Sequence, residues 1–125
     1  MTFYETQLWK IRKAFPSDEV CDRIGKAVKF MDENYGSGIT LDQLASEACM
    51  SKFHFVRVFR KLHGRTPYQY LTSTRMRQAA SALRANLTVT HACYDAGFDS
   101  TTTFASRFRK SVGVAPSQYA RRWSK

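Results

Sequence analysis

The feature that most constrains the fold of this 125-residue chain is an internal repeat. Residues of identical type recur at an offset of 49 positions, among them eight pairs: Phe55 and Phe104, Phe59 and Phe108, Arg60 and Arg109, Lys61 and Lys110, Gly64 and Gly113, Pro67 and Pro116, Gln69 and Gln118, Tyr70 and Tyr119. Upstream the offset becomes 48, so the second copy carries one extra residue. Such self-similarity indicates one supersecondary unit built twice.

Helical periodicity runs through both copies, and no segment alternates convincingly like a β-strand. Helices are predicted at 19–35, 41–48, 52–62, 67–85, 88–96 and 101–112, with a last short helix from 116 to 119. Thr40 and Gln43 have the spacing of a capping box. In the sixth helix, Phe104, Phe108 and Val112 are expected to point inward. The predicted fold class is therefore all-α, with about seven helices.

Each copy has a short helix, a tight turn and a basic helix, which together form a helix-turn-helix. We expect four parts: an N-terminal extension (1–18), a first helix-turn-helix subdomain (19–66), a linker helix (67–85) and a second helix-turn-helix subdomain (86–125). The linker helix would be roughly 28 Å long.

Positive charge is concentrated in the last three-fifths of the chain. Residues 1–50 hold six Lys or Arg against eight Asp or Glu, whereas residues 51–125 hold fourteen against two. The segments 52–65 and 100–125 contain no acidic residue at all. A solvated helix face normally mixes acids with bases, so a polyanionic partner explains this distribution better than solvation does.

The repeat also carries a family resemblance. The stretch DAGFDSTTTFASRFRKSVGVAPSQYARRW, residues 95–123, resembles the signature of the AraC/XylS family of bacterial transcription regulators, and the resemblance extends over residues 19–123. It implies an all-helical domain in which a long central helix joins two helix-turn-helix units. It further implies a sequence-specific DNA-binding regulator that inserts one recognition helix of each unit into the major groove.

The resemblance places base contacts at Phe53, Val56, Arg57, Thr101, Thr102 and Ser106. Chemically, Arg57 suits guanine, while Phe53 and Val56 suit a thymine methyl group. We predict phosphate contacts from Thr40, Lys52, Arg60, Lys61, Arg107, Arg109 and Lys110. The chain departs from the family pattern at Cys49, where a glycine is common and where a positive φ would cost about 1 kcal/mol.

Other chemistry finds little support in the sequence. The three cysteines have no C-x-x-C spacing and the three histidines stand at no ligand spacing, so we expect no metal site, no cofactor and no catalytic residue. The cysteine usage favours a reduced cytoplasmic compartment. The expected partners are double-stranded DNA, bound by a monomer, and RNA polymerase as a further candidate.

Two other classes of function remain open at this stage. A non-specific polyanion-binding or RNA-binding helical module would also use a basic helical surface, and competition with unrelated DNA at moderate salt would separate it from a specific binder. A helix lying on an anionic membrane is disfavoured because inward aromatic stripes and turn residues specify a packed domain. We therefore expect no membrane partner.

Overall fold

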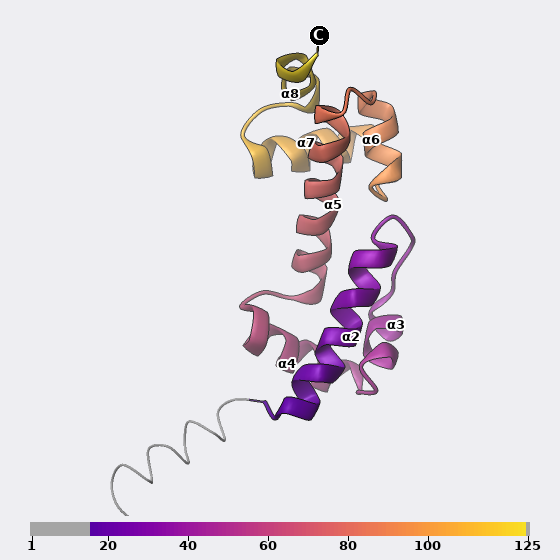
Figure 1. Cartoon of the computed structure of the whole chain (residues 1–125), viewed down its shortest axis with the longest axis vertical. Helices are drawn as coiled ribbons and strands as arrows, with labels where there is room; N and C mark the ends of the chain where they lie inside the picture. Colours follow the sequence, from indigo (N-terminus) through magenta and orange to yellow (C-terminus); the bar gives the residue numbers. More distant parts are fainter. Residues whose placement is uncertain (1–15, 125) are drawn as a thin grey trace, which may run out of the picture. The chain divides into compact units, whose positions relative to one another are not determined.

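The computed structural model describes residues 16–124 of the chain. Figure 1 shows its helices: α2 (Asp18–Asn34), α3 (Leu41–Glu47), α4 (Lys52–His63), α5 (Pro67–Arg84), α6 (Val89–Asp95), α7 (Thr101–Val112) and α8 (Pro116–Trp123). This described part contains helices and no β-strand, which confirms the all-α prediction. The predicted N-terminal extension lies outside the described residues as far as residue 15.

The chain divides into two compact units. The first comprises 16–31 and Thr40–Pro67, and therefore holds most of α2 together with α3 and α4. The second comprises Asp32–Ile39 and 68–124, and holds α5 beyond its first residue together with α6, α7 and α8. Each unit thus contains one helix-turn-helix.

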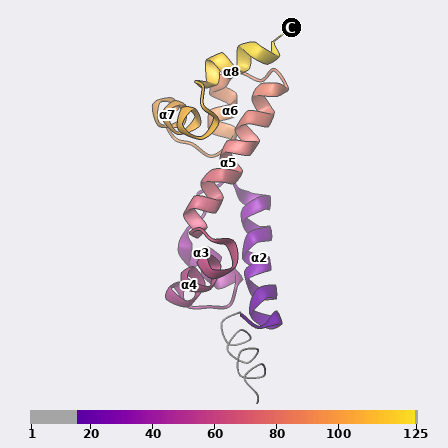
Figure 2. The ribbon, with the colours of Figure 1, turned by 90° about the vertical axis from the view of Figure 1, so that its left-hand side faces the viewer.

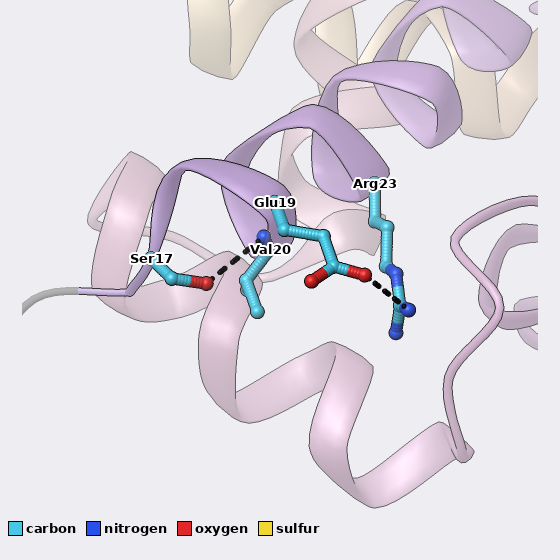
Figure 3. Close-up of polar contacts among 4 residues, drawn as sticks. All are labelled: Ser17, Glu19, Val20 and Arg23. Atoms are coloured by element: carbon cyan, nitrogen blue, oxygen red, sulfur yellow. Dashed lines mark hydrogen bonds and ion pairs between the residues drawn. The ribbon is translucent and has the colours of Figure 1, made fainter.

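Helix α2 begins with interactions within its first turns (Figure 3). The Ser17 hydroxyl oxygen accepts a hydrogen bond from the backbone N–H of Val20 at 3.3 Å, and Arg23 forms an ion pair with Glu19 at 2.8 Å. The carboxylates of Asp18 and Glu19 lie in the first turn, where the helix dipole favours negative charge. These local interactions explain why α2 begins one residue before its predicted start.

The two helix-turn-helix units use the same hydrogen bonds at matched positions. The N-cap hydroxyl oxygens and the backbone N–H groups that they accept from are Thr40 with Gln43, Thr88 with His91, Ser51 with His54, and Ser100 with Thr103. The second helix of each unit, α4 or α7, ends at a glycine in the left-handed conformation, Gly64 or Gly113. The N–H of that glycine donates to the carbonyl oxygen four residues earlier. The sequence repeat is therefore a repeat of helix boundaries.

A separate apolar core fills each unit. In the first, the buried residues come from α2, α3 and α4: Ile24, Ala27, Met31, Leu44, Ala45, Phe55, Val58 and Phe59. In the second, they come from α5, α6 and α7: Met76, Ala79, Ala80, Leu83, Ala92, Cys93, Phe104 and Phe108, with Ala96 just after α6. Figure 2 shows α6, α7 and α8 gathered against α5. Because α4 and α7 each pack one face on a core, the opposite face of each helix points outward.

Two sequence expectations are corrected by the structure. Val112 does not point inward, because its side chain is 38% exposed. A spacing of four residues overshoots one helical turn by about 40°, so Val112 is turned roughly 80° from Phe104. Helix α8 continues past Tyr119 to Trp123, since the rings of these two residues pack with centroids 6.4 Å apart and the residues between them are good helix formers.

Cys49 occupies the turn of the first helix-turn-helix with a positive φ of 54°, as expected from the sequence. The matching residue of the second copy is Gly97, with φ 99°. Because an L-residue is strained in this region, Cys49→Gly should raise the free energy of unfolding by up to about 1 kcal/mol. Urea denaturation measures the change. Cys49→Ser, which keeps the Cβ atom, is the control, and equal stability of the two variants would contradict the strain argument.

Candidate nucleic-acid interface

The first candidate surface is the outward face of α4. The rings of Phe55 and Phe59 are fully buried, which turns the opposite side of the helix to solvent. On that side Phe53 is 91% exposed, Arg57 is exposed and Val56 is half-buried. Phe53, Val56 and the partly exposed Leu41 line the same surface, and an exposed apolar patch of this kind indicates a contact surface. The structure therefore brings together the three base-contacting residues predicted for the first unit.

An open hollow follows this face of α4. Its lining comprises Leu41, Ser51, Lys52, Phe53, His54, Val56, Arg57, Arg60, Lys61 and Gly64. It combines the predicted base contacts with three of the predicted phosphate contacts, which are Lys52, Arg60 and Lys61. Leu41 and His54 also line it, and neither was expected at the site from the sequence. Leu41 is the first residue of α3, directly after Thr40, the N-cap residue of the predicted capping box. That capping box was the sequence signal for the position of Leu41.

Two residues of the predicted phosphate set already have partners within the first unit. The Thr40 hydroxyl oxygen accepts from the N–H of Gln43 at 3.1 Å, and the Gln43 side chain accepts from the N–H of Thr40 at 2.9 Å. The Thr40 hydroxyl can still donate its proton to a phosphate oxygen. The Lys52 ammonium lies 3.3 Å from the Asp42 carboxylate, in an exposed pair. Asp42 therefore offsets part of the positive charge at the start of α4.

The second candidate surface is the outward face of α7. Phe104 and Phe108 are fully buried, and Thr101, Thr102 and Ser106 are exposed. The predicted phosphate-contacting residues Arg107, Arg109 and Lys110 are exposed as well. The structure places all six of these predicted residues on one recognition helix. It has short hydroxyl side chains where α4 carries Phe53 and Arg57.

Arg107 has an aromatic neighbour within the second unit. Its guanidinium carbon lies 5.8 Å from the centroid of the Tyr68 ring, a distance at which a cation–π attraction operates. Tyr68 itself is 60% exposed, at the start of α5. The ring restricts the guanidinium while leaving its N–H donors open to solvent, which suits a phosphate contact.

The histidines and cysteines do not form a reactive or metal-binding cluster in the described part of the chain. His63 stacks on Phe59 with ring centroids 4.4 Å apart, and burial together with the charge of Arg65 lowers its pKa. Burial raises the pKa of the Cys93 thiol, which keeps it protonated in the core. Over residues 16–124, no group of three His, Cys, Asp or Glu could hold a metal ion. None of the described helices combines the length and apolar character needed to cross a membrane.

Comparison with known proteins identifies the family. A helix-turn-helix domain model matches residues 44–122. The HTH-type transcriptional activator AarP of Providencia stuartii is 33% identical over 97 residues, which cover 77% of this chain and 72% of AarP. The DNA-binding domain of the transcription factor AdpA, solved in complex with a target DNA, superposes with a TM-score of 0.76 at 29% identity, covering 80% of this chain and 91% of that domain.

The chain belongs to the AraC/XylS family of transcription regulators. The fold of a regulator from Chromobacterium violaceum, described as having an AraC-type DNA-binding domain, agrees with a TM-score of 0.76 at 21% identity and covers 83% of this chain and 94% of that protein. Against several other curated relatives the chain spans only about a third of their length, between 31% and 36%. The matched region is thus the tandem helix-turn-helix portion of this AraC/XylS family member.

Proposed function

We propose that this AraC/XylS family member is a transcription regulator that binds a specific double-stranded DNA sequence by placing α4 and α7 in successive major grooves. The observation that carries the proposal is the pair of matched recognition helices. Each is capped by the same residues, each buries two phenylalanines, and each turns an exposed face free of acidic residues to solvent. The match to a DNA-bound domain supports the same conclusion.

The residues divide into two proposed roles. Base contacts come from Phe53, Val56 and Arg57 on α4 and from Thr101, Thr102 and Ser106 on α7, because these side chains, exposed except for the half-buried Val56, occupy the outward helix faces. Phosphate contacts come from Thr40, Lys52, Arg60, Lys61, Arg107, Arg109 and Lys110, which are exposed and can donate to phosphate oxygens. Phosphate contacts position the protein, and base contacts select the sequence.

Two partners follow from this proposal. Double-stranded DNA is the first, and a single chain suffices because it carries both recognition helices. RNA polymerase is the second, since the relative AarP is named a transcriptional activator. A regulator of this kind would act in the cytoplasm, where bacterial DNA lies.

Selection of bound sequences from random DNA, followed by measurement of the binding stoichiometry, tests the proposal. We expect one chain on an asymmetric site that spans about two helical turns of DNA, because one covalent chain supplies both recognition helices. Affinity for that site should exceed affinity for unrelated DNA by roughly a thousandfold or more. A strict requirement for two chains on a palindrome would contradict single-chain binding. Equal affinity for all sequences would instead favour a non-specific polyanion-binding module.

A further inference from the structure

The segment Asp32–Ile39, which comprises the last three residues of α2 and most of the turn toward α3, is held by side chains of α5. Arg75 donates from Nε to the carbonyl oxygen of Tyr35 at 2.8 Å and from Nη2 to the carbonyl oxygen of Ser37 at 3.0 Å. Five residues earlier on α5, the Tyr70 hydroxyl lies 3.3 Å from Oδ1 of Asp32. Two side chains of α5 therefore hold the last turn of α2 and the residues that follow it.

The same segment packs backbone against backbone on the turn between α6 and α7. A Cβ atom on Gly36 would lie 2.8 Å from the carbonyl oxygen of Asp95. A Cβ atom on Gly97 would lie 2.9 Å from the carbonyl oxygen of Tyr35 and 3.0 Å from Nε of Arg75. No side chain fits between these two pieces of chain, so the segment is seated directly on the turn of the second helix-turn-helix.

The hydrogen bonds of Arg75 are the polar part of this attachment. Its guanidinium is half-buried, and burial lowers the pKa of Arg75. A charged group drawn out of water keeps its charge where hydrogen bonds replace its hydration. The carbonyl oxygens of Tyr35 and Ser37 supply that replacement. Arg75 is thus directed at the connecting segment rather than at solvent.

The chain enters and leaves this segment through the first unit. Residues 16–31 precede it and Thr40–Pro67 follow it, and both belong to the unit that carries α4. The segment itself belongs to the unit that carries α7. The segment is thus a covalent connection between α4 and α7, in addition to the one that α5 provides. Contacts that fix the segment therefore stiffen this connection.

We propose that Arg75 is a positioning residue that fixes Asp32–Ile39 and thereby sets how narrowly the protein selects the spacing between its two half-sites. The inference rests on the proposed function, because half-site spacing matters only if both units read DNA. When the first unit is bound, a stiff connection gives the second unit a high effective concentration at its half-site for one half-site spacing and a low effective concentration for other spacings. A loose connection spreads that concentration over several spacings, without changing either reading face.

The test compares wild type with Arg75→Ala on DNA duplexes that keep both half-sites and vary their separation by one base pair at a time. Wild type should prefer one spacing over its neighbours by about tenfold or more, and Arg75→Ala should reduce this preference to about twofold. Binding to a duplex with a single half-site should stay within about twofold of wild type, since no reading residue changes. A residue that served stability alone would not move the spacing profile.

Arg84→Ala is the matched control. Arg84 lies on the same helix, carries the same charge and donates to the Tyr119 hydroxyl at 2.7 Å, away from the segment that Arg75 binds. It should keep the wild-type spacing profile. Gly97→Ala tests the same contact without a change of charge, and it should broaden the profile because its Cβ atom would displace Tyr35.

A wild-type spacing profile in Arg75→Ala overturns the inference, as does equal broadening in Arg84→Ala. If Arg75→Ala does not fold, Arg75→Lys takes its place, because an ammonium group keeps the charge but cannot span both carbonyl oxygens. An unchanged profile in that variant also overturns the inference. Failure of the proposed function itself is visible separately, as a wild-type protein that shows no preference between specific and random DNA.

Discussion

The affinity of the protein for its DNA site should fall about a thousandfold when the salt concentration is raised from 50 to 200 mM. Six of the proposed phosphate-contacting residues are Lys or Arg. Each phosphate that such a residue neutralises releases counterions and contributes about −0.9 to the slope of log K against log salt. Six contacts therefore give a slope of about −5. Fluorescence anisotropy titrations of one labelled duplex over that salt range measure it.

Single substitutions separate the contributors to this slope. Arg109→Ala should make the slope shallower by about one unit and weaken binding to all sequences alike, because a phosphate contact carries no sequence information. Lys52→Ala should change the slope less, since the Lys52 ammonium already lies 3.3 Å from the Asp42 carboxylate. A nearly flat salt dependence of the unaltered protein would contradict the argument from charge.

The fold could be predicted closely from the sequence because its helix boundaries are set locally. The N-cap hydroxyls of Thr40 and Ser51 act on backbone groups three residues away, and Gly64 ends its helix through its own conformation. Each of these helix boundaries is determined by interactions within a few residues. The same capping residues recur in the second copy, so its helix boundaries could be predicted in the same way.

The expectations that needed correction concern the last turns of α7 and α8. Val112 lies at the spacing of Phe104 and Phe108 but has turned away from the core by the end of α7. The length of α8 depends on the packing of Trp123 on Tyr119. Both outcomes are local: the first follows from a drift of about 40° for each step of four residues, and the second from two rings four residues apart on one helix.

The outward placement of the predicted base-contacting residues could be read from the sequence, whereas their contacts with neighbouring residues could not. The outward positions of Phe53 and Arg57 follow from the inward stripe of α4. The pairing of Lys52 with Asp42 and the bonds from Arg75 to the α2–α3 connection join residues whose contact arises only on folding. Side-chain contacts of this kind produce no periodic pattern in a single sequence, so sequence reasoning could not predict them.

Arg57→Ala should remove most of the preference for one base pair in the first half-site. The side chain is exposed on the outward face of α4 and lines the hollow beside Phe53. A bidentate contact from its guanidinium to guanine O6 and N7 is worth about 1–3 kcal/mol of discrimination, which corresponds to a 5-fold to 150-fold change. Affinities for duplexes that carry each of the four base pairs at that position measure the loss.

Ser106→Ala is the matched substitution in the second unit, at an offset of 49 residues from Arg57. Ser106 is exposed on α7, but its hydroxyl is too short and has too few donors for a two-pronged contact with guanine. Its removal should therefore change base preference much less than Arg57→Ala does. The first unit would then supply most of the base selectivity. The second unit would mainly bind phosphates, through Arg107, Arg109 and Lys110. Equal weakening of specific and random DNA by Arg57→Ala, or loss of all preference at the second half-site in Ser106→Ala, would show that the two helices divide the work differently.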